Sequence, residues 1–125
     1  MPVQHLAINE IGDVSIVRFS DRILDESNVL EVGRELFELL DQDGRKNLLL
    51  NFSDVTFLSS SALGKLITLH RKVKAVGGSL HFSNICPNIH SINFSLTRLD
   101  QLFEIHEDEP DALAAFAETQ GAAEE

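Results

Sequence analysis

The feature that most constrains this chain is a short apolar run, Leu48-Leu49-Leu50, at the centre of residues 47–52. A run that places apolar side chains on both sides of an extended backbone is typical of a strand buried on both faces of a sheet. We therefore predict that residues 47–52 form the central strand of the fold.

Patterns before this run predict a hairpin and a helix. Residues 3–9 and 14–19 alternate apolar with polar side chains, and Gly12-Asp13 between them is typical of a tight hairpin turn. Apolar side chains over residues 27–40 then recur at helical spacing, and Ser27 is the expected N-cap. The chain thus opens with two antiparallel strands and a helix.

After the run, helices and strands alternate. A helix begins near residues 59–61 and ends at Gly77-Gly78, and two further strands are expected at residues 79–83 and 102–105. Proline at a first helical turn predicts two more helices, one from Pro87 to about Phe94 and one that starts near Pro110 and is anchored by Leu113 and Phe116.

The predicted fold class is α/β, because right-handed crossovers make the later strands parallel. We expect a single domain over residues 1–120, with a mixed sheet that opens with an antiparallel hairpin and is flanked by about four helices in one layer or two. Residues 121–125 are expected to form a frayed C-terminal tail.

Length and composition indicate one soluble globular domain. The 125 residues are 43% hydrophobic and 24% charged, which is ordinary for such a domain. The apolar runs are far shorter than the about 20 residues of a membrane span, and the first residues lack the features of a secretory signal. We therefore expect a cytoplasmic protein without a membrane span.

Charge and cysteine content exclude several classes of function. Twenty acidic against ten basic residues give a net charge of −10, which disfavours direct binding to nucleic acid. Cys86 is the single cysteine, and no Cys-x-x-Cys or His-x-x-x-His spacing is present. We predict no disulfide, no metal site and no cofactor. The sequence does not indicate the oligomeric state.

Three consecutive serines, Ser59, Ser60 and Ser61, stand at the predicted start of a helix. Free backbone amides and the positive end of the helix dipole would favour a phosphate there. A phosphoserine adds a charge of about −1.5 to −2, enough to change how a docked partner binds. The alternative is that serine only caps the helix, as it commonly does.

The sequence resembles STAS domains of the anti-sigma factor antagonist family. The opening strands share the likeness, and its main segments are residues 48–64 (LLLNFSDVTFLSSSALG), 75–80 (AVGGSL), 99–105 (LDQLFEI) and 111–116 (DALAAF). They cover most of the chain in the family's order.

The resemblance implies a protein that binds an anti-sigma factor of the serine-kinase type and thereby frees a sigma factor. It also implies that the kinase phosphorylates Ser60 to end the interaction and that a phosphatase resets it. Many antagonists have aspartate before this serine where this chain has Ser59, and glycine is frequent at the position of Ala62. Ser59 and Ser61 therefore remain secondary candidates for phosphorylation.

Two further groups of residues are candidates for contact with a partner. On the family likeness, the loop from Asp21 to Ser27 lies near the serines, where partners dock, although it also reads as an ordinary polar loop. Basic residues of the serine helix, Lys65 first among them, either contact an acidic partner or form a solvated helix face. The local basic concentration comprises Lys65, Arg71, Lys72 and Lys74.

An enzymatic function finds no support in the sequence. The five histidines are scattered, and we expect each to be a surface or half-buried side chain. The chain is therefore predicted not to be an enzyme, with a serine hydrolase as the catalytic alternative. A further alternative is an unphosphorylated STAS scaffold, or a transporter-associated or ligand-binding subunit.

Overall fold

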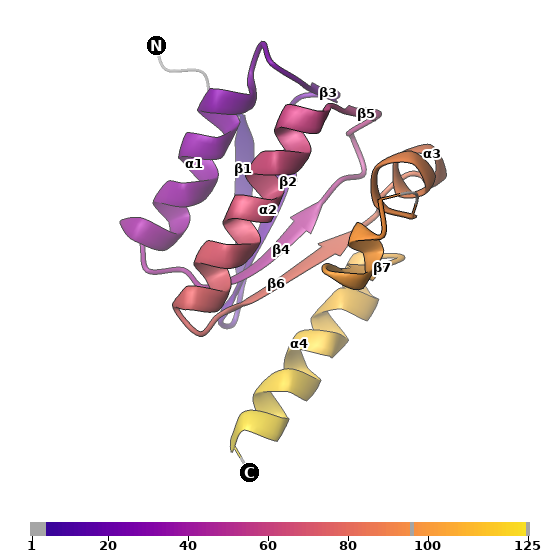
Figure 1. Ribbon diagram of the computed structural model, residues 1–125. Coiled ribbons are helices and arrows are strands. Elements are labelled where there is room, and N and C mark those ends of the chain that lie inside the picture. Colours follow the sequence, from indigo (N-terminus) through magenta and orange to yellow (C-terminus); the bar gives the residue numbers. More distant parts are fainter. Residues whose placement is uncertain (1–4, 96, 125) are drawn as a thin grey trace.

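The computed structural model describes residues 5–95 and 97–124 (Figure 1). The elements in chain order are β1 (Leu6–Ile11), β2 (Val14–Phe19), β3 (Ile23–Leu24), α1 (Val29–Asp41), β4 (Asn47–Asn51), β5 (Phe57–Leu58), α2 (Ser60–Ala75), β6 (Ser79–Ser83), α3 (Pro87–Ile89), β7 (Glu104–His106) and α4 (Glu109–Glu124). A π-helical segment, His90–Ser95, continues α3, and a 3₁₀ turn, Leu99–Gln101, precedes β7. None of the described helices is long and apolar enough to cross a membrane.

The main sheet has the strand order β1-β2-β4-β6-β7. β1 and β2 form the predicted antiparallel hairpin, and every later neighbour in this sheet is parallel. β4 is the middle strand, as the apolar run predicts. The α/β fold class with a mixed sheet and an opening hairpin is confirmed.

Helices cover the sheet in two layers, which answers the question that the sequence left open. Figure 1 shows α1 and α2 side by side over one face and α4 extending from the end of β7 toward the bottom of the view. Residues of α4 pack with Leu49 on the other face of the sheet. Leu48 and Leu50 point into the larger core under α1 and α2, whereas Leu49 packs in a smaller core with Ala112 and Phe116 of α4. The alternation of a strand thus explains why an unbroken leucine run fits β4.

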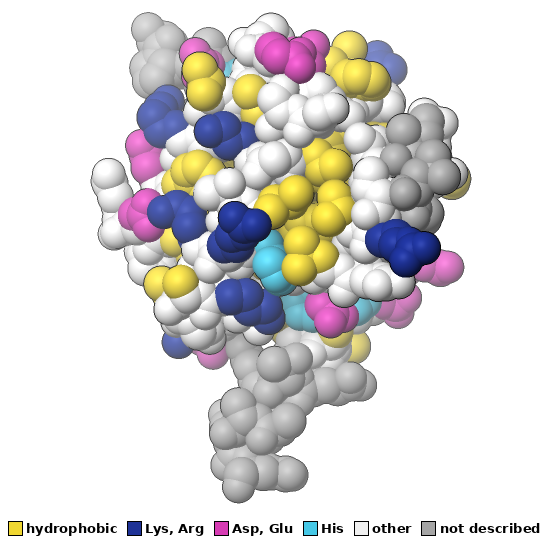
Figure 2. All heavy atoms as spheres, in the orientation of Figure 1, with side chains coloured by type: hydrophobic (Ala, Val, Ile, Leu, Met, Phe, Trp, Pro, Cys, Tyr) yellow, Lys and Arg dark blue, Asp and Glu magenta, His cyan; other side chains and the backbone are white. Residues whose placement is uncertain are grey.

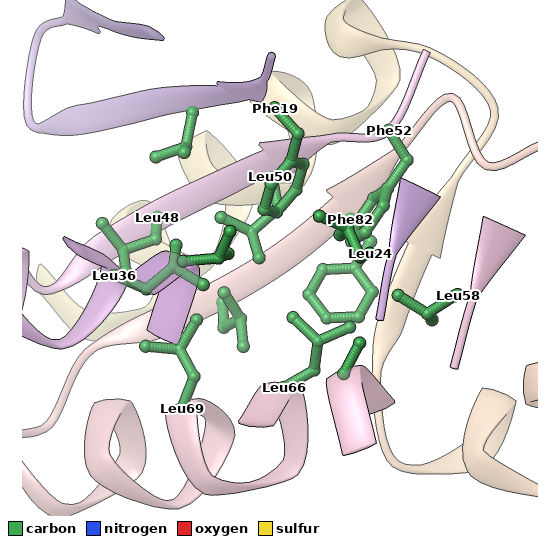
Figure 3. Packing of buried hydrophobic residues seen from close by; sticks show 14 of the residues in the cluster. Phe19, Leu24, Leu36, Leu48, Leu50, Phe52, Leu58, Leu66, Leu69 and Phe82 are labelled. Atoms are coloured by element: carbon green, nitrogen blue, oxygen red, sulfur yellow. The ribbon is translucent and has the colours of Figure 1, made fainter. Parts of the chain in front are cut away.

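A second, two-stranded sheet pairs β3 with β5 in parallel. Leu24 and Leu58 are almost fully buried and reach the core beside Phe82, as Figure 3 shows. Their strand neighbours Ile23 and Phe57 face solvent. The sequence did not predict these strands, because two residues are too few to establish an alternating pattern.

The start of α1 differs from the prediction. Asn28, not Ser27, is the N-cap residue, and its side chain makes no capping hydrogen bond. The hydroxyl of Ser27 instead donates to Asp25 Oδ1 at 2.6 Å, which closes a local turn before the helix. The prediction of a Ser27 cap was therefore wrong.

The C-terminal third differs from the prediction at two element boundaries. The last strand begins at Glu104 rather than at Leu102, because the Phe103 amide completes the preceding turn by donating to Leu99 O at 3.0 Å. The helix α4 continues through Glu124, past the expected start of fraying at residue 121. The division into a domain over residues 1–120 and a tail over 121–125 stays a prediction.

Candidate functional site

The three serines lie where β5 passes into α2. Ser59 is the N-cap of α2, and its side-chain oxygen accepts a hydrogen bond from the amide of Ala62 at 3.2 Å. Its own amide donates to Leu24 O of β3 at 2.9 Å, and its side chain is buried. Ser59 is therefore a structural cap that fixes where the helix begins.

Ser61 is exposed but engaged. Its hydroxyl donates to the Glu26 carboxylate at 2.9 Å and lies 3.1 Å from the Ser59 hydroxyl. Glu26 belongs to the loop between β3 and α1, so this contact ties that loop to the first turn of α2. The family likeness placed the loop from Asp21 to Ser27 near the serines but did not single out Glu26, which is 35 positions from Ser61.

Ser60 is the first residue of α2 and is exposed. Within residues 5–95 and 97–124, its hydroxyl has no hydrogen-bond partner, and the backbone amides of Ser60 and Ser61 have no acceptor. An oxyanion attached at Ser60 would lie beside these two free amides and the positive end of the helix dipole. Of the three hydroxyls, Ser60 is thus the accessible and unengaged one.

The loop from Asp21 to Ser27 lies beside the serines, although Asp21 itself points elsewhere. Arg22 O accepts hydrogen bonds from the Thr56 and Phe57 amides at 2.7 and 3.3 Å, which joins the loop to β5. Asp21 accepts from His5 Nδ1 at 2.6 Å, in a cluster with Glu31 of α1. The structure therefore gives Asp21 a partner within the chain, and its role in partner binding stays a prediction.

Lys65 faces α1 rather than the serines. Its aliphatic stem crosses α1 at Gly33, where the absence of a side chain lets the two helices approach closely. Its ammonium group lies 5.9 Å from the centre of the Phe37 ring, which the Lys72 ammonium approaches to 5.3 Å. Figure 2 shows Lys and Arg side chains gathered over α1 and α2 with acidic side chains among them. Arg34 pairs with Glu38 at 3.1 Å, and Lys72 pairs with Asp41 at 3.3 Å.

The small sheet, whose strand β5 ends directly before the N-cap Ser59, carries an exposed apolar pair. Ile23 and Phe57 are register partners in the small sheet, and they are 49% and 52% exposed. Large apolar side chains exposed side by side near a helix start are a feature of docking surfaces. We call Ile23 and Phe57 the apolar pair.

The histidines do not all match the expectation of surface or half-buried side chains. His5 and His81 are buried, with 7% and 5% of their surface exposed. Burial lowers the pKa of His81 to about 4, and its Nδ1 lies 2.9 Å from Nε2 of His106. Among the described residues, no histidine is hydrogen-bonded to Ser59, Ser60 or Ser61.

Comparison with known proteins is consistent with this geometry. The chain resembles a Thermotoga maritima protein of known structure with 21% identity and a TM-score of 0.79, covering 88% of this chain and 92% of that one. It is similar to an anti-sigma factor antagonist from Mycobacterium paratuberculosis, with 24% identity, a TM-score of 0.77 and coverage of 88% and 91%.

A third similar structure is the Bacillus cell fate determinant SpoIIAA in its phosphorylated form. It shares 19% identity and a TM-score of 0.67, with coverage of 89% of this chain and 98% of that one. At these identities the likeness establishes the shared fold. The STAS domain model matches residues 5–112, which is most of the sequence, and the chain therefore belongs to the STAS domain family.

Proposed function

We propose that this protein is a cytoplasmic anti-sigma factor antagonist. In its unmodified form it binds an anti-sigma factor that is also a serine kinase, and this binding releases a sigma factor. The kinase then phosphorylates Ser60, the complex dissociates, and a phosphatase restores the unmodified protein. The chain is a substrate in this cycle, and ATP and the catalytic groups belong to the kinase.

The observation that carries the proposal is the difference between Ser60 and its two neighbours. A kinase needs an accessible hydroxyl, and the Ser59 hydroxyl is buried and used as a helix cap. The Ser61 hydroxyl is bound to Glu26, whose negative charge would repel an added phosphate. Ser60 is exposed and needs no rearrangement of the helix start to be modified.

The surroundings of Ser60 explain how one phosphate would end binding without unfolding the protein. A charge of about −1.5 to −2 at the first residue of α2 is favoured by the free amides and the dipole of that helix. The same charge beside the apolar pair would need to be desolvated when a partner docks. Phosphorylation would thus stabilise the free protein and weaken the complex.

The family membership and two of the similar proteins support the same reading. One of these proteins is an anti-sigma factor antagonist. The other is a cell fate determinant whose structure was solved in its phosphorylated form. Basic side chains over α1 and α2 offer a further surface for an acidic region of the kinase.

Phosphosite mapping by mass spectrometry tests the proposal. The wild type and the variants Ser60→Ala, Ser59→Ala and Ser61→Ala are incubated with ATP and a lysate of the source organism. We expect phosphate on Ser60 in the wild type and in the Ser61→Ala variant, and none in Ser60→Ala. Phosphate on Ser61 or Ser59 in the wild type would contradict the assignment to Ser60.

A binding measurement separates the antagonist from an unphosphorylated scaffold. The kinase recovered from that lysate is titrated with wild type, Ser60→Asp and, as the matched control, Ser61→Ala. We expect Ser60→Asp to bind at least about tenfold more weakly, since a buried unpaired charge costs several kcal/mol. Equal affinity of wild type and Ser60→Asp would instead favour the scaffold or transporter-associated function.

A further inference from the structure

A buried histidine interrupts the apolar packing on the α4 face of the main sheet. The register of β2, β4 and β6 aligns Ile16, Leu49 and His81 in one row, and the first two are core residues beneath α4. His81 is 5% exposed, and the centre of its ring lies 4.1 Å from that of Phe116. A titratable ring thus occupies a place in the row where its neighbours are aliphatic.

The edge strand brings two further metal-binding side chains to the same place. Glu104 is the register partner of His81, and His106 lies two residues further on the same face of β7. His81 Nδ1 and His106 Nε2 are 2.9 Å apart. One ligand atom from each of the three residues lies within 4.8 Å of the other two.

We propose that His81, Glu104 and His106 form a binding site for a divalent transition metal ion, for which zinc is the natural probe. Two imidazoles and one carboxylate, with a fourth position left to solvent, are a common ligand set for zinc. Two nitrogens bound to one zinc ion lie about 3.3 Å apart at tetrahedral angles, given zinc–nitrogen bonds of about 2.0–2.1 Å. The nitrogen–nitrogen distance of the histidine pair needs to open by only a few tenths of an ångström, while the two rings turn and the Glu104 carboxylate moves in so that all three ligand atoms face the ion.

The chemistry of the pair favours a cation at this point. A hydrogen bond between two ring nitrogens uses one N–H group and one lone pair, so one ring already directs a lone pair toward the other. A bound ion would take the place of the N–H hydrogen, which would move to the other nitrogen of its ring or to solvent. The Glu104 carboxylate adds negative charge, and the net charge of −10 raises the local concentration of cations. The exposed side of Glu104 leaves access for the ion from solvent.

Such an ion would fasten the edge of the sheet. β7 has three residues and pairs on one side only, with β6. Ligands from both strands would link β7 to β6 directly beneath α4, which packs on β4, β6 and β7. The proposal is independent of the antagonist function, because the site lies on the face of the sheet opposite α1 and α2.

Calorimetric titration of the metal-free protein with zinc chloride tests the site, together with thermal unfolding followed by far-UV circular dichroism. The ligand variants are His106→Gln and Glu104→Gln, which leave the buried His81 in place. The controls are Glu107→Gln, an exposed acidic residue of the same segment, and His70→Gln, a histidine of α2 on the other face. Each variant is compared with its own metal-free form.

We expect one zinc ion per chain and an increase in Tm with zinc in the wild type and both controls. Loss of a residue that only orients a metal ligand typically weakens metal binding by about 10- to 100-fold. His106→Gln removes a ligand itself and should weaken zinc binding by more than this, and Glu104→Gln should also weaken it. Absence of binding in the wild type, or unchanged affinity in His106→Gln, would overturn the proposal. So would loss of binding in Glu107→Gln alone, which would indicate an acidic surface site.

Discussion

The side-chain oxygen of Ser59 accepts the hydrogen bond of the Ala62 amide, whereas the neighbouring Ser60 hydroxyl points into solvent without a partner among the described residues. Two adjacent serines therefore have different physical roles. Loss of an N-cap serine typically costs about 1 kcal/mol, and an exposed substitution changes stability by about 0.5 kcal/mol or less.

We accordingly predict that Ser59→Ala lowers the free energy of unfolding by about 1 kcal/mol and that Ser60→Ala leaves it nearly unchanged. Urea unfolding followed by far-UV circular dichroism measures both, since the chain has no tryptophan or tyrosine to report by fluorescence. The same measurement on Ser60→Asp should show a stability equal to or slightly above that of the wild type, because the added negative charge lies at the positive end of α2. Equal losses in Ser59→Ala and Ser60→Ala would contradict the assignment of the cap.

The buried His5 predicts a pH dependence of stability. Its Nε2 lies 2.7 Å from Glu31, its Nδ1 lies 2.6 Å from Asp21, and its amide donates to the Glu35 carboxylate at 3.1 Å. The hydrogen bond to Glu31 is the main reason that the pKa of His5 is raised above 6.5, and Asp21 adds to the effect while burial opposes it. The folded state therefore favours the protonated ring.

Because the folded-state pKa of His5 is the higher one, its contribution is complete below the unfolded value of about 6.5 and is lost as the pH rises through the folded-state pKa. We expect the difference in unfolding free energy between wild type and His5→Gln to be largest below about pH 6.5 and to shrink as the pH rises above that value. His70, whose pKa burial lowers, should give the opposite trend in His70→Gln. A difference for His5→Gln that stays constant with pH would show that folding does not change the pKa of this ring, and one that grows with rising pH would show that the fold favours the neutral ring.

The two glycines that end α2 differ in what they tolerate. Gly77 has a φ of +74° with open space around it, whereas a β-carbon at Gly78 would overlap the backbone carbonyl of Lys46. Gly77→Ala should thus cost about 1–2 kcal/mol, the usual penalty of a left-handed backbone. Gly78→Ala should cost more, because Lys46 O also receives the Ser79 amide at 3.0 Å and anchors the start of β6. Thermal unfolding of the two variants shows which one is less stable. A smaller loss of stability in Gly78→Ala than in Gly77→Ala would contradict the close approach of Gly78 to the Lys46 carbonyl.

The sequence predicts the main sheet well because its strands carry strong local patterns. β6 has the predicted bounds, and β4 is central because three leucines in a row suit a strand with a core on either side. The small sheet was not predicted, since β3 and β5 are each two residues long and depend on pairing across the fold. The contact of Ser61 with Glu26 likewise joins a helix and a loop that are 35 positions apart in the sequence.

The histidine cluster shows the same limit at a candidate site. We predicted no metal site because no local spacing of cysteine or histidine suggested one. His81 and His106 come from different strands 25 positions apart, so only the β6–β7 register brings them together. Local motifs detect ligands on one helix or one turn, and they cannot detect ligands that a sheet assembles.

The small sheet offers a matched pair of variants for the docking surface. Phe57 is 52% exposed and Leu58 is 3% exposed, although they are neighbours in β5. Because Leu58 fills the core, Leu58→Ala should cost about 2–5 kcal/mol of stability. Phe57→Ala removes a side chain that is half in solvent, and we expect it to change stability far less.

Binding to the proposed kinase partner should show the reverse order, with Phe57→Ala affected more than Leu58→Ala, when each variant is assayed well below its Tm. Truncating an aromatic side chain at the centre of an interface typically costs about 1 kcal/mol or more, so Phe57→Ala should weaken binding by about fivefold or more. Ile23→Ala, its register partner, should weaken binding in the same direction. Calorimetric titration measures all three variants. If Phe57→Ala and Ile23→Ala bind as tightly as the wild type, the partner does not dock on the apolar pair, and the surface beside Ser60 acts through the phosphate alone.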